Sequence, residues 1–325
     1  MKRLYILCFL LLLTGATSLS QTPRFYLGFD GIFDNREYFT PYSIHQTIFG
    51  ARINPGVVFQ WDTVHQLHVG LNYMYEFGGE LLGVLPQIDL YYKYHGEQLK
   101  FFFGSFPRRE LLDEPLMLLT DSLGYYRPNL EGAWIGTRWD WGSVQGWVDW
   151  TGRETPETRE SIMGGANATI RSSLLYLTSG ATWYHLAKTT ADDDPYAIRD
   201  EGSVKVMAGA DLSDRTVLDR LELTTGWVGT HARTRPAPTT WFHGWLSLLE
   251  VQYRIGGIKG SYYLGDPSPL SYGDRLYGSG NYGRLDIFIE PIRNDRMSAK
   301  ISWNLHLLPG DGLYHSQQIL LYIRL

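Results

Sequence analysis

The chain has 325 residues, with 29 basic and 34 acidic side chains, and its mean hydropathy is −0.21. This length allows one large all-β domain or two ordinary domains. The charge is mildly acidic and forms no basic stripe, so we expect no nucleic-acid partner. The single cysteine, Cys8, predicts no disulfide framework.

The first 20 residues have the pattern of a secretory signal peptide. Lys2 and Arg3 form a short basic region, Leu4–Leu13 form an apolar one, and small and polar residues follow. Cleavage removes these two basic residues and no acidic one, which changes the net charge from −5 to −7. The remaining chain has no run of about 18 apolar residues, so we expect no membrane-spanning helix.

From residue 24 onward, apolar and polar residues alternate in short segments. In "SAKISWNLHLL" (298–308), for example, Ile301 and Trp303 share one face, and Lys300 and Asn304 share the other. Period-two alternation predicts a strand with one apolar and one polar face. The predicted strands are 24–33, 47–61, 66–77, 84–94, 98–105, 130–139, 144–151, 161–170, 174–187, 203–212, 219–230, 240–253, 258–265, 281–292, 298–307 and 315–325.

Alternation alone does not show which face meets water, since a soluble sandwich and a membrane barrel share it. The connections distinguish the two, because short turns and longer polar loops follow each other along the chain. This alternation of short and long connections is typical of an outer-membrane barrel with short periplasmic turns and long external loops. We therefore predict an all-β, antiparallel, up-and-down transmembrane barrel of about sixteen strands, with both termini in the periplasm. The predicted turns are 62–65, 95–98, 140–143, 171–173, 213–218, 254–257 and 293–297, and the predicted loops are 34–46, 78–83, 106–129, 152–160, 188–202, 231–239, 266–280 and 308–314.

The signal peptide, the hairpin rhythm and the last strand, "HSQQILLYIRL", together resemble a Gram-negative outer-membrane porin-type barrel. They are also similar to uncharacterised Bacteroidota outer-membrane barrels. Ile319, Leu321, Ile323 and Leu325 alternate up to the chain end, as in the signal that the barrel assembly machinery reads. The resemblance implies a signal peptide over 1–20 and one barrel over 21–325. It also implies outer-membrane lipid as surroundings, the assembly machinery as a partner during insertion, and a possible homo-oligomer.

For this architecture we predict a porin-like channel for passive diffusion of small hydrophilic solutes, without a cofactor, a metal or enzymatic activity. A sixteen-strand ring is too wide for wall side chains to fill, and charges of both signs fall on inward positions. A dry interior would tolerate so many charges only if they paired. The predicted pore-lining wall is Arg52, Asp89, Lys93, Lys100, Arg138, Asp149, Glu250, Arg284, Asp286 and Lys300.

The longest loop, 106–129, reads "FPRRELLDEPLMLLTDSLGYYRPN" and combines charges with the apolar run Leu116–Leu119. We expect the apolar run to pack on the inner wall while the charges narrow the channel, faced by cations such as Lys100, Arg138 and Arg52. The alternative is a loop that packs across the mouth or against its neighbours. The predicted constriction residues are Arg108, Arg109, Glu110, Asp113, Glu114 and Asp121.

Two other functions remain open: a barrel enzyme acting on lipid, and a plugged structural or accessory barrel. A lipid hydrolase would need a serine near a histidine, but no His-x-Ser occurs, and the adjacent His315 and Ser316 point to opposite faces. A cross-strand Ser–His pair on the outer surface would favour the enzyme. The acidic segment Asp192–Asp194 is interpreted as a solvated loop rather than a Ca²⁺ site, because the order of an EF-hand is absent.

Overall fold

The computed structural model describes residues 23–109, 111–189 and 198–325. The predicted signal peptide, Glu110 and the segment Asp192–Asp194 lie outside the described residues. Within the described ranges, no helix has both the length and the apolar composition needed to cross a membrane.

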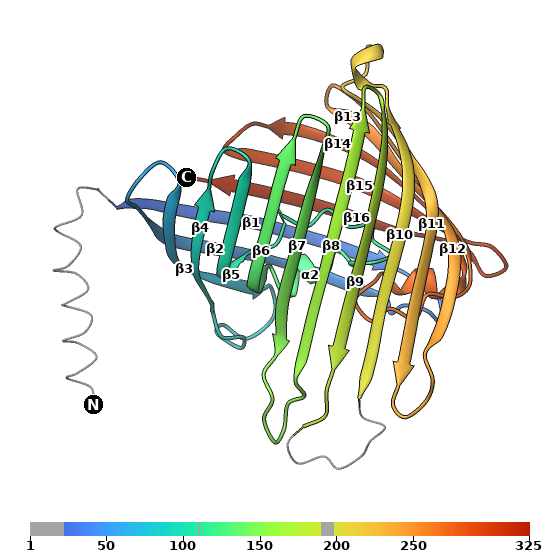
Figure 1. Ribbon diagram of the computed structural model, residues 1–325, viewed down its shortest axis with the longest axis horizontal. Helices are drawn as coiled ribbons and strands as arrows, with labels where there is room; N and C mark the ends of the chain where they lie inside the picture. The colour runs from blue at the N-terminus through green and yellow to red at the C-terminus, as the bar shows by residue number, and fades with distance from the viewer. Residues whose placement is uncertain (1–22, 110, 190–197) are drawn as a thin grey trace.

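Sixteen antiparallel strands form one closed barrel, in which every strand pairs with its neighbours in the chain and β1 pairs with β16 (Figure 1). The predicted fold class and strand number are therefore confirmed. The strands are β1 Arg24–Glu37, β2 Gln46–Gln60, β3 His65–Glu76, β4 Gln87–His95, β5 Leu99–Pro107, β6 Asn129–Trp139, β7 Gly142–Gly152, β8 Ser161–Ser172, β9 Leu175–Leu186, β10 Arg199–Asp211, β11 Arg220–Thr234, β12 Thr240–Tyr253, β13 Gly256–Gly265, β14 Asn281–Arg293, β15 Met297–Leu308 and β16 Gly312–Arg324.

Strand β15 shows which face of the barrel is apolar. Ile301 and Trp303 are 43% and 49% exposed on the outside, whereas Ser302, Asn304 and His306 are buried inside. Because the side chains of a strand alternate, the same division extends along the wall. The barrel thus presents apolar side chains outward, as a barrel in lipid requires, and its interior holds polar side chains together with buried apolar clusters.

One predicted connection is wrong. Residues 308–314 do not form a long loop, because β15 continues to Leu308 and β16 already begins at Gly312. Gly310 has a φ of +90°, which glycine adopts without strain, and the Asp311 N–H donates to the Leu308 carbonyl at 2.9 Å. Two long strands therefore meet at a tight turn, which places Asn304 directly opposite Ser316 and His306 diagonally next to it on the same face.

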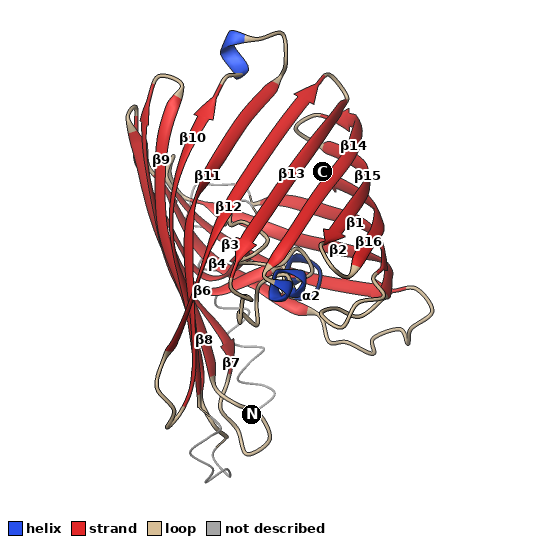
Figure 2. Ribbon diagram, turned by 90° about the vertical axis from the view of Figure 1, so that its right-hand side faces the viewer, coloured by secondary structure: helices blue, strands red, loops and turns tan. Residues whose placement is uncertain are grey.

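The short connections gather at one end of the barrel, here called the turn end, and most of the long ones at the other, called the loop end. Two loop-end segments, residues 108–128 with helix α2 (Leu123–Tyr126) and residues 266–280 with the 3₁₀ helix η4 (Arg275–Ser279), fold inward. Figure 2 shows α2 within the ring of strands. Tyr125 of α2 packs in a buried cluster with Ile32 and Ile48 of the wall, so α2 is anchored to the inner face of β1 and β2.

Candidate functional site

The two inward-folding segments, 108–128 and 266–280, are joined to each other and are called the plug loops below. The Thr120 N–H donates to the Tyr272 carbonyl at 2.8 Å, and the Asp274 N–H donates to the Leu116 carbonyl at the same distance. Met117 and Leu118 are buried in one apolar cluster with side chains of β10 to β15. The plug loops therefore form one unit that is packed against the wall.

Buried ion pairs fasten this unit to separate strands. Arg108 donates to Asp149 of β7 at 2.6 Å, and Glu114 pairs with Lys205 of β10. Asn167 of β8 also donates to the Glu114 carboxylate, at 2.5 Å. Breaking a buried pair by removing one partner leaves an uncompensated charge, which is strongly unfavourable. The wall charges thus hold the first plug loop in place.

The other predicted constriction residues have different positions. Arg109 stacks its guanidinium over the Tyr322 ring at 3.9 Å, whereas Asp113 is exposed. Glu110 lies outside the described residues. Asp121 takes part in the polar cluster at the loop end described below.

The buried wall residues are bonded to one another or to the plug. Arg52 pairs with Asp30 at 3.2 Å and donates to the Tyr125 carbonyl of α2. Asp89 accepts from Asn129 at 2.5 Å, and Arg284 donates to Asp286 at 2.6 Å. Around the plug loops, these wall charges are therefore bonded to neighbouring side chains or to the plug rather than spread along an open channel.

The remaining predicted wall residues include several that lie nearer the turn end. Glu250 pairs with Lys259 at 3.0 Å, and Lys93 and Lys300 lie over the rings of Phe102 and Phe288. Lys100 and Arg138 are exposed at the turn-end tips of β5 and β6. Of the three cations expected to face the long loop, the structure brings only Arg52 to it.

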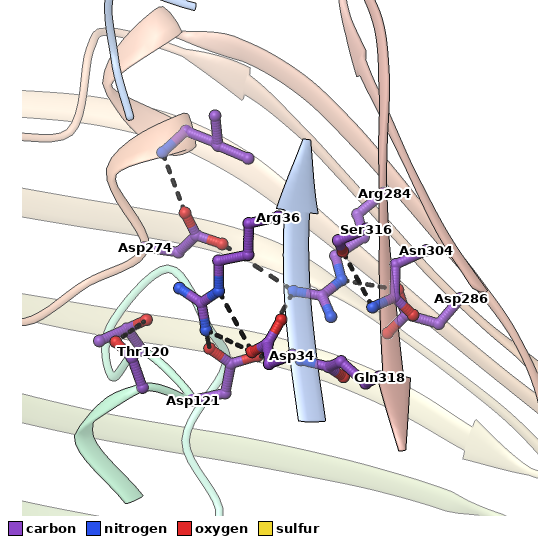
Figure 3. Close-up of polar contacts among 12 residues, drawn as sticks. Asp34, Arg36, Thr120, Asp121, Asp274, Arg284, Asp286, Asn304, Ser316 and Gln318 are labelled. Atoms are coloured by element: carbon purple, nitrogen blue, oxygen red, sulfur yellow. Dashed lines mark hydrogen bonds and ion pairs between the residues drawn. The ribbon is translucent and has the colours of Figure 1, made fainter. Parts of the chain in front are cut away.

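A polar cluster lies where the plug loops meet strands β1, β14, β15 and β16 (Figure 3). Arg36 donates to Asp34 at 2.7 Å and to Asp121 at 3.0 Å. Gln318 donates to the same two carboxylates, at 3.0 and 3.2 Å. Asp274 of the second plug loop lies 3.9 Å from Arg284 and also accepts from the Leu276 N–H. This network joins the plug to the wall beside Ser316.

The pKa values of two carboxyls in this cluster, Asp121 and Asp274, shift in opposite directions. Burial disfavours ionisation of Asp121, but Arg36 and Arg284 outweigh it and lower the pKa of this carboxyl. Burial raises the pKa of Asp274, and Arg284 only partly opposes that effect. Of these two carboxyls, Asp121 is therefore the one that depends more on its cationic partners.

A Ser–His pair lies next to this cluster, on two neighbouring strands. Ser316 Oγ of β16 is 3.0 Å from His306 Nε2 of β15, and His306 Nδ1 is 2.6 Å from the Tyr282 hydroxyl of β14. Asn304, directly opposite Ser316 in the register, donates from Nδ2 to Ser316 Oγ at 3.1 Å. These are hydrogen-bonding distances between a potential nucleophile, a base and a group that orients the base.

The hydrogen bonds favour a productive arrangement of protons. Because Asn304 donates to Ser316 Oγ, the serine can direct its own proton to His306 Nε2. The ring proton then resides on Nδ1 and is donated to the Tyr282 oxygen. Tyr38 packs edge-on against the imidazole, with ring centroids 4.7 Å apart, and both Ser316 and His306 are fully buried. The pair is thus ordered and covered.

The sequence interpretation missed this pair because it placed a long loop at 308–314. A loop of that length does not define the register between β15 and β16, so no contact between His306 and Ser316 could be predicted. The signal was present in "LPGDG", which forms the tight turn between the strands. The pair also lies on the inner face, whereas a lipid hydrolase was expected to place it on the outer surface.

An apolar outer face and sixteen antiparallel strands closed into one barrel define an outer-membrane β-barrel protein. A model of the lipid A 3'-O-deacylase-type family matches residues 18–323, and the chain belongs to this family. No curated protein matches the chain. The expectation that the protein is not an enzyme is wrong, because the family is one of deacylases.

Solved outer-membrane barrels share the fold at very low sequence identity. A loop-deletion mutant of Vibrio cholerae OmpT is similar over 94% of this chain and 99% of its own, with a TM-score of 0.58 and 9% identity. The anion-selective porin of Comamonas acidovorans gives 0.56 and 8%, over 94% and 100% of the two chains. OmpF of Salmonella typhi gives 0.53 and 12%, over 93% and 97%. These similarities support the architecture alone.

Proposed function

We propose that the protein is an outer-membrane hydrolase that removes an ester-linked acyl chain from a glycolipid of the lipid A type. The observation that carries the proposal is the Ser316–His306 hydrogen bond of 3.0 Å in a chain whose family is of the lipid A 3'-O-deacylase type. Nucleophile, base and orienting group converge from three consecutive strands. This arrangement suits acyl transfer through a serine ester.

The reaction would proceed in two steps. Ser316 Oγ attacks the ester carbonyl carbon while His306 Nε2 takes the hydroxyl proton, and the carbon–oxygen bond to the sugar then breaks as His306 returns that proton to the leaving oxygen. Water, deprotonated by His306, next attacks the carbonyl carbon of the acyl-serine, and the bond to Ser316 Oγ breaks as His306 returns the proton to that oxygen, which releases the fatty acid. Tyr282 would hold the imidazole in the required tautomer, and Asn304, whose Nδ2 lies 3.1 Å from Ser316 Oγ, would donate to the negative charge that develops on the carbonyl oxygen.

The proposal also orients the barrel. Strand β1 begins and strand β16 ends at the turn end, which we assign to the periplasm, and the Ser–His pair lies near the loop end. The loop end would then face outside the cell, at the level of the outer leaflet. Because Tyr38 and the plug loops cover the pair, substrate entry requires them to move.

The test is deacylation of purified lipid A by the full-length protein in detergent micelles, followed by mass spectrometry of both products. Ser316→Ala should reduce the rate at least a thousandfold, as loss of a serine nucleophile does in other hydrolases. Ser302→Ala, a buried serine on the same inner face of β15, is the matched control and should leave the rate unchanged. Wild-type activity in Ser316→Ala would refute the assignment.

A covalent probe gives independent evidence about the nucleophile. A fluorophosphonate that carries a long alkyl chain should label the wild type at Ser316, as located by peptide mapping. Labelling should disappear in His306→Gln, because the serine loses its base. Labelling at another serine would assign the reaction elsewhere on the barrel.

A porin-like channel for small hydrophilic solutes remains the second candidate function, favoured by the mixed charges on the inner wall and by a long loop inside the barrel. Planar-bilayer conductance tests it. Replacing Glu110, Asp113 and Glu114 with their amides should shift selectivity toward anions, and deleting residues 110–122 should raise conductance. No change in either measurement would place the loop outside a permeation path.

A further inference from the structure

Aromatic and charged side chains gather on the outer face of the barrel, on strands β9 to β12 near the loop end. Trp183, Gly202, His231 and Trp241 are directly opposite one another in the register of these four strands. Both tryptophans are exposed, at 42% and 50%. Exposed tryptophans at this height are typical of the boundary between lipid tails and headgroups.

Gly202 creates a hollow in this row. A Cβ atom at this position would lie 2.5 Å from His231 Nε2, so the imidazole occupies the space that a side chain would take. The His231 ring is 4.9 Å from the Trp241 ring, and its Nδ1 atom is buried without a hydrogen-bond partner. The histidine is thus held in the wall with one unused polar atom.

The adjacent row, one step nearer the loop end, carries charge. His185 Nδ1 lies 2.7 Å from one oxygen of Asp200, and Arg235 Nε donates to the other at 3.1 Å. Arg233 is directly opposite Asp200 in the register, and its Nε donates to the Ala237 carbonyl at 3.0 Å. One imidazole and one guanidinium group therefore contact the Asp200 carboxylate, while Arg233 lies opposite Asp200 and His231 lies in the neighbouring row of the same face.

We propose that these residues, called the rim patch (His185, Asp200, His231, Arg233 and Arg235), bind a phosphate group of an outer-membrane glycolipid. Guanidinium groups bind phosphate through paired hydrogen bonds, and Asp200 orients Arg235 and His185 without neutralising the patch. Trp183 and Trp241 place the patch at headgroup height, which favours a lipid phosphate over free phosphate. The inference goes beyond the proposed hydrolysis and does not depend on Ser316.

The test uses native mass spectrometry of the full-length protein with lipid A and with the same lipid after enzymatic removal of its phosphates. The wild type should bind the phosphorylated form about tenfold more tightly. In Arg233→Gln/Arg235→Gln this preference should fall at least fivefold, because each arginine near a lipid surface accounts for roughly that factor. Binding of the dephosphorylated lipid should not change.

A charge-matched control is Arg215→Gln/Arg254→Gln, two arginines at the turn end, which should retain the full preference. Heat-modified migration of the barrel in gels verifies that both double variants are folded. Equal affinities of the wild type and the rim variant for phosphorylated lipid would overturn the proposal. Displacement of the lipid by millimolar inorganic phosphate would also overturn it, because the site would then recognise the free anion.

Discussion

The ion pair between Glu114 and Lys205 offers the sharpest test of what holds the plug in the barrel. Lys205 is 5% exposed, and the Glu114 carboxylate is buried against both Lys205 and Asn167. Lys205→Met keeps the length and apolar stem of the side chain but removes its charge. Asn167 still donates one hydrogen bond, yet Glu114 becomes a buried carboxylate without a counter-ion.

Removing one partner of a buried pair costs about 3–5 kcal/mol, which lowers the ratio of closed to open plug more than a hundredfold. The loss can be measured in two ways: urea unfolding in liposomes, and hydrogen exchange over residues 111–128. We expect Lys205→Met to lower the free energy of unfolding and to expose this segment to exchange. Glu114→Gln/Lys205→Met should recover most of both losses, because no buried charge is left unpaired.

Lys259→Met is the matched control, since Lys259 also pairs with a glutamate, Glu250, but its side chain is 45% exposed. A pair in that environment contributes at most about 1 kcal/mol. If Lys205→Met and Lys259→Met had the same small effect, the plug would not depend on buried ion pairs.

Three further perturbations test the wall, the plug and the candidate site. Ile301→Arg should lower the free energy of unfolding in liposomes by about 2–4 kcal/mol, because Ile301 faces lipid. Lys300→Leu, on the inner face, should lower it far less. Equal sensitivity of the two variants to urea would contradict this assignment of the inner and outer faces. The pKa of Asp121 is lowered when the plug is closed, so its contribution to closure is complete above the ordinary value of 3.8 and is lost as the pH falls through the lower, closed-state pKa. Conductance should therefore stay low from pH 7 to about 4 and rise only below it, whereas Asp121→Asn should show no such transition. Tyr282→Phe should reduce deacylation about tenfold to a hundredfold without preventing fluorophosphonate labelling, because it removes the group that orients His306 and leaves the nucleophile in place.

The architecture could be predicted from the sequence because a barrel in lipid repeats one simple rule. Each strand must alternate, and each pair of strands must be joined at alternating ends, so errors at single boundaries do not change the count. Strand β4, for example, begins at Gln87 rather than at residue 84 without affecting its partners. The inside and outside faces follow from the same alternation once lipid is identified as the outer medium.

The interior could not be predicted in this way, because its contacts depend on register and on loops that enter the barrel. The charges on inward positions predict a water-filled channel rather than a dry interior of paired charges, whereas the structure pairs Arg108 with Asp149 and Glu114 with Lys205. Alternation places Asp149 and Lys205 on the inner face but says nothing of which loop residue meets them. Those partners are far apart in the chain and are selected only when the plug loops fold.

The Ser316–His306 pair shows how strongly a site of this kind depends on one turn. The two side chains belong to different hairpin strands, and their 3.0 Å contact exists only if the β15–β16 connection is three residues long. A one-residue change in register would send Ser316 to the lipid face and break the contact. The length of the turn at 309–311 is therefore as necessary for the Ser316–His306 contact as the two side chains themselves. Insertion of one residue after Gly310 should leave a folded barrel while abolishing both deacylation and fluorophosphonate labelling at Ser316, and retained activity in that variant would mean that the reaction does not use this pair.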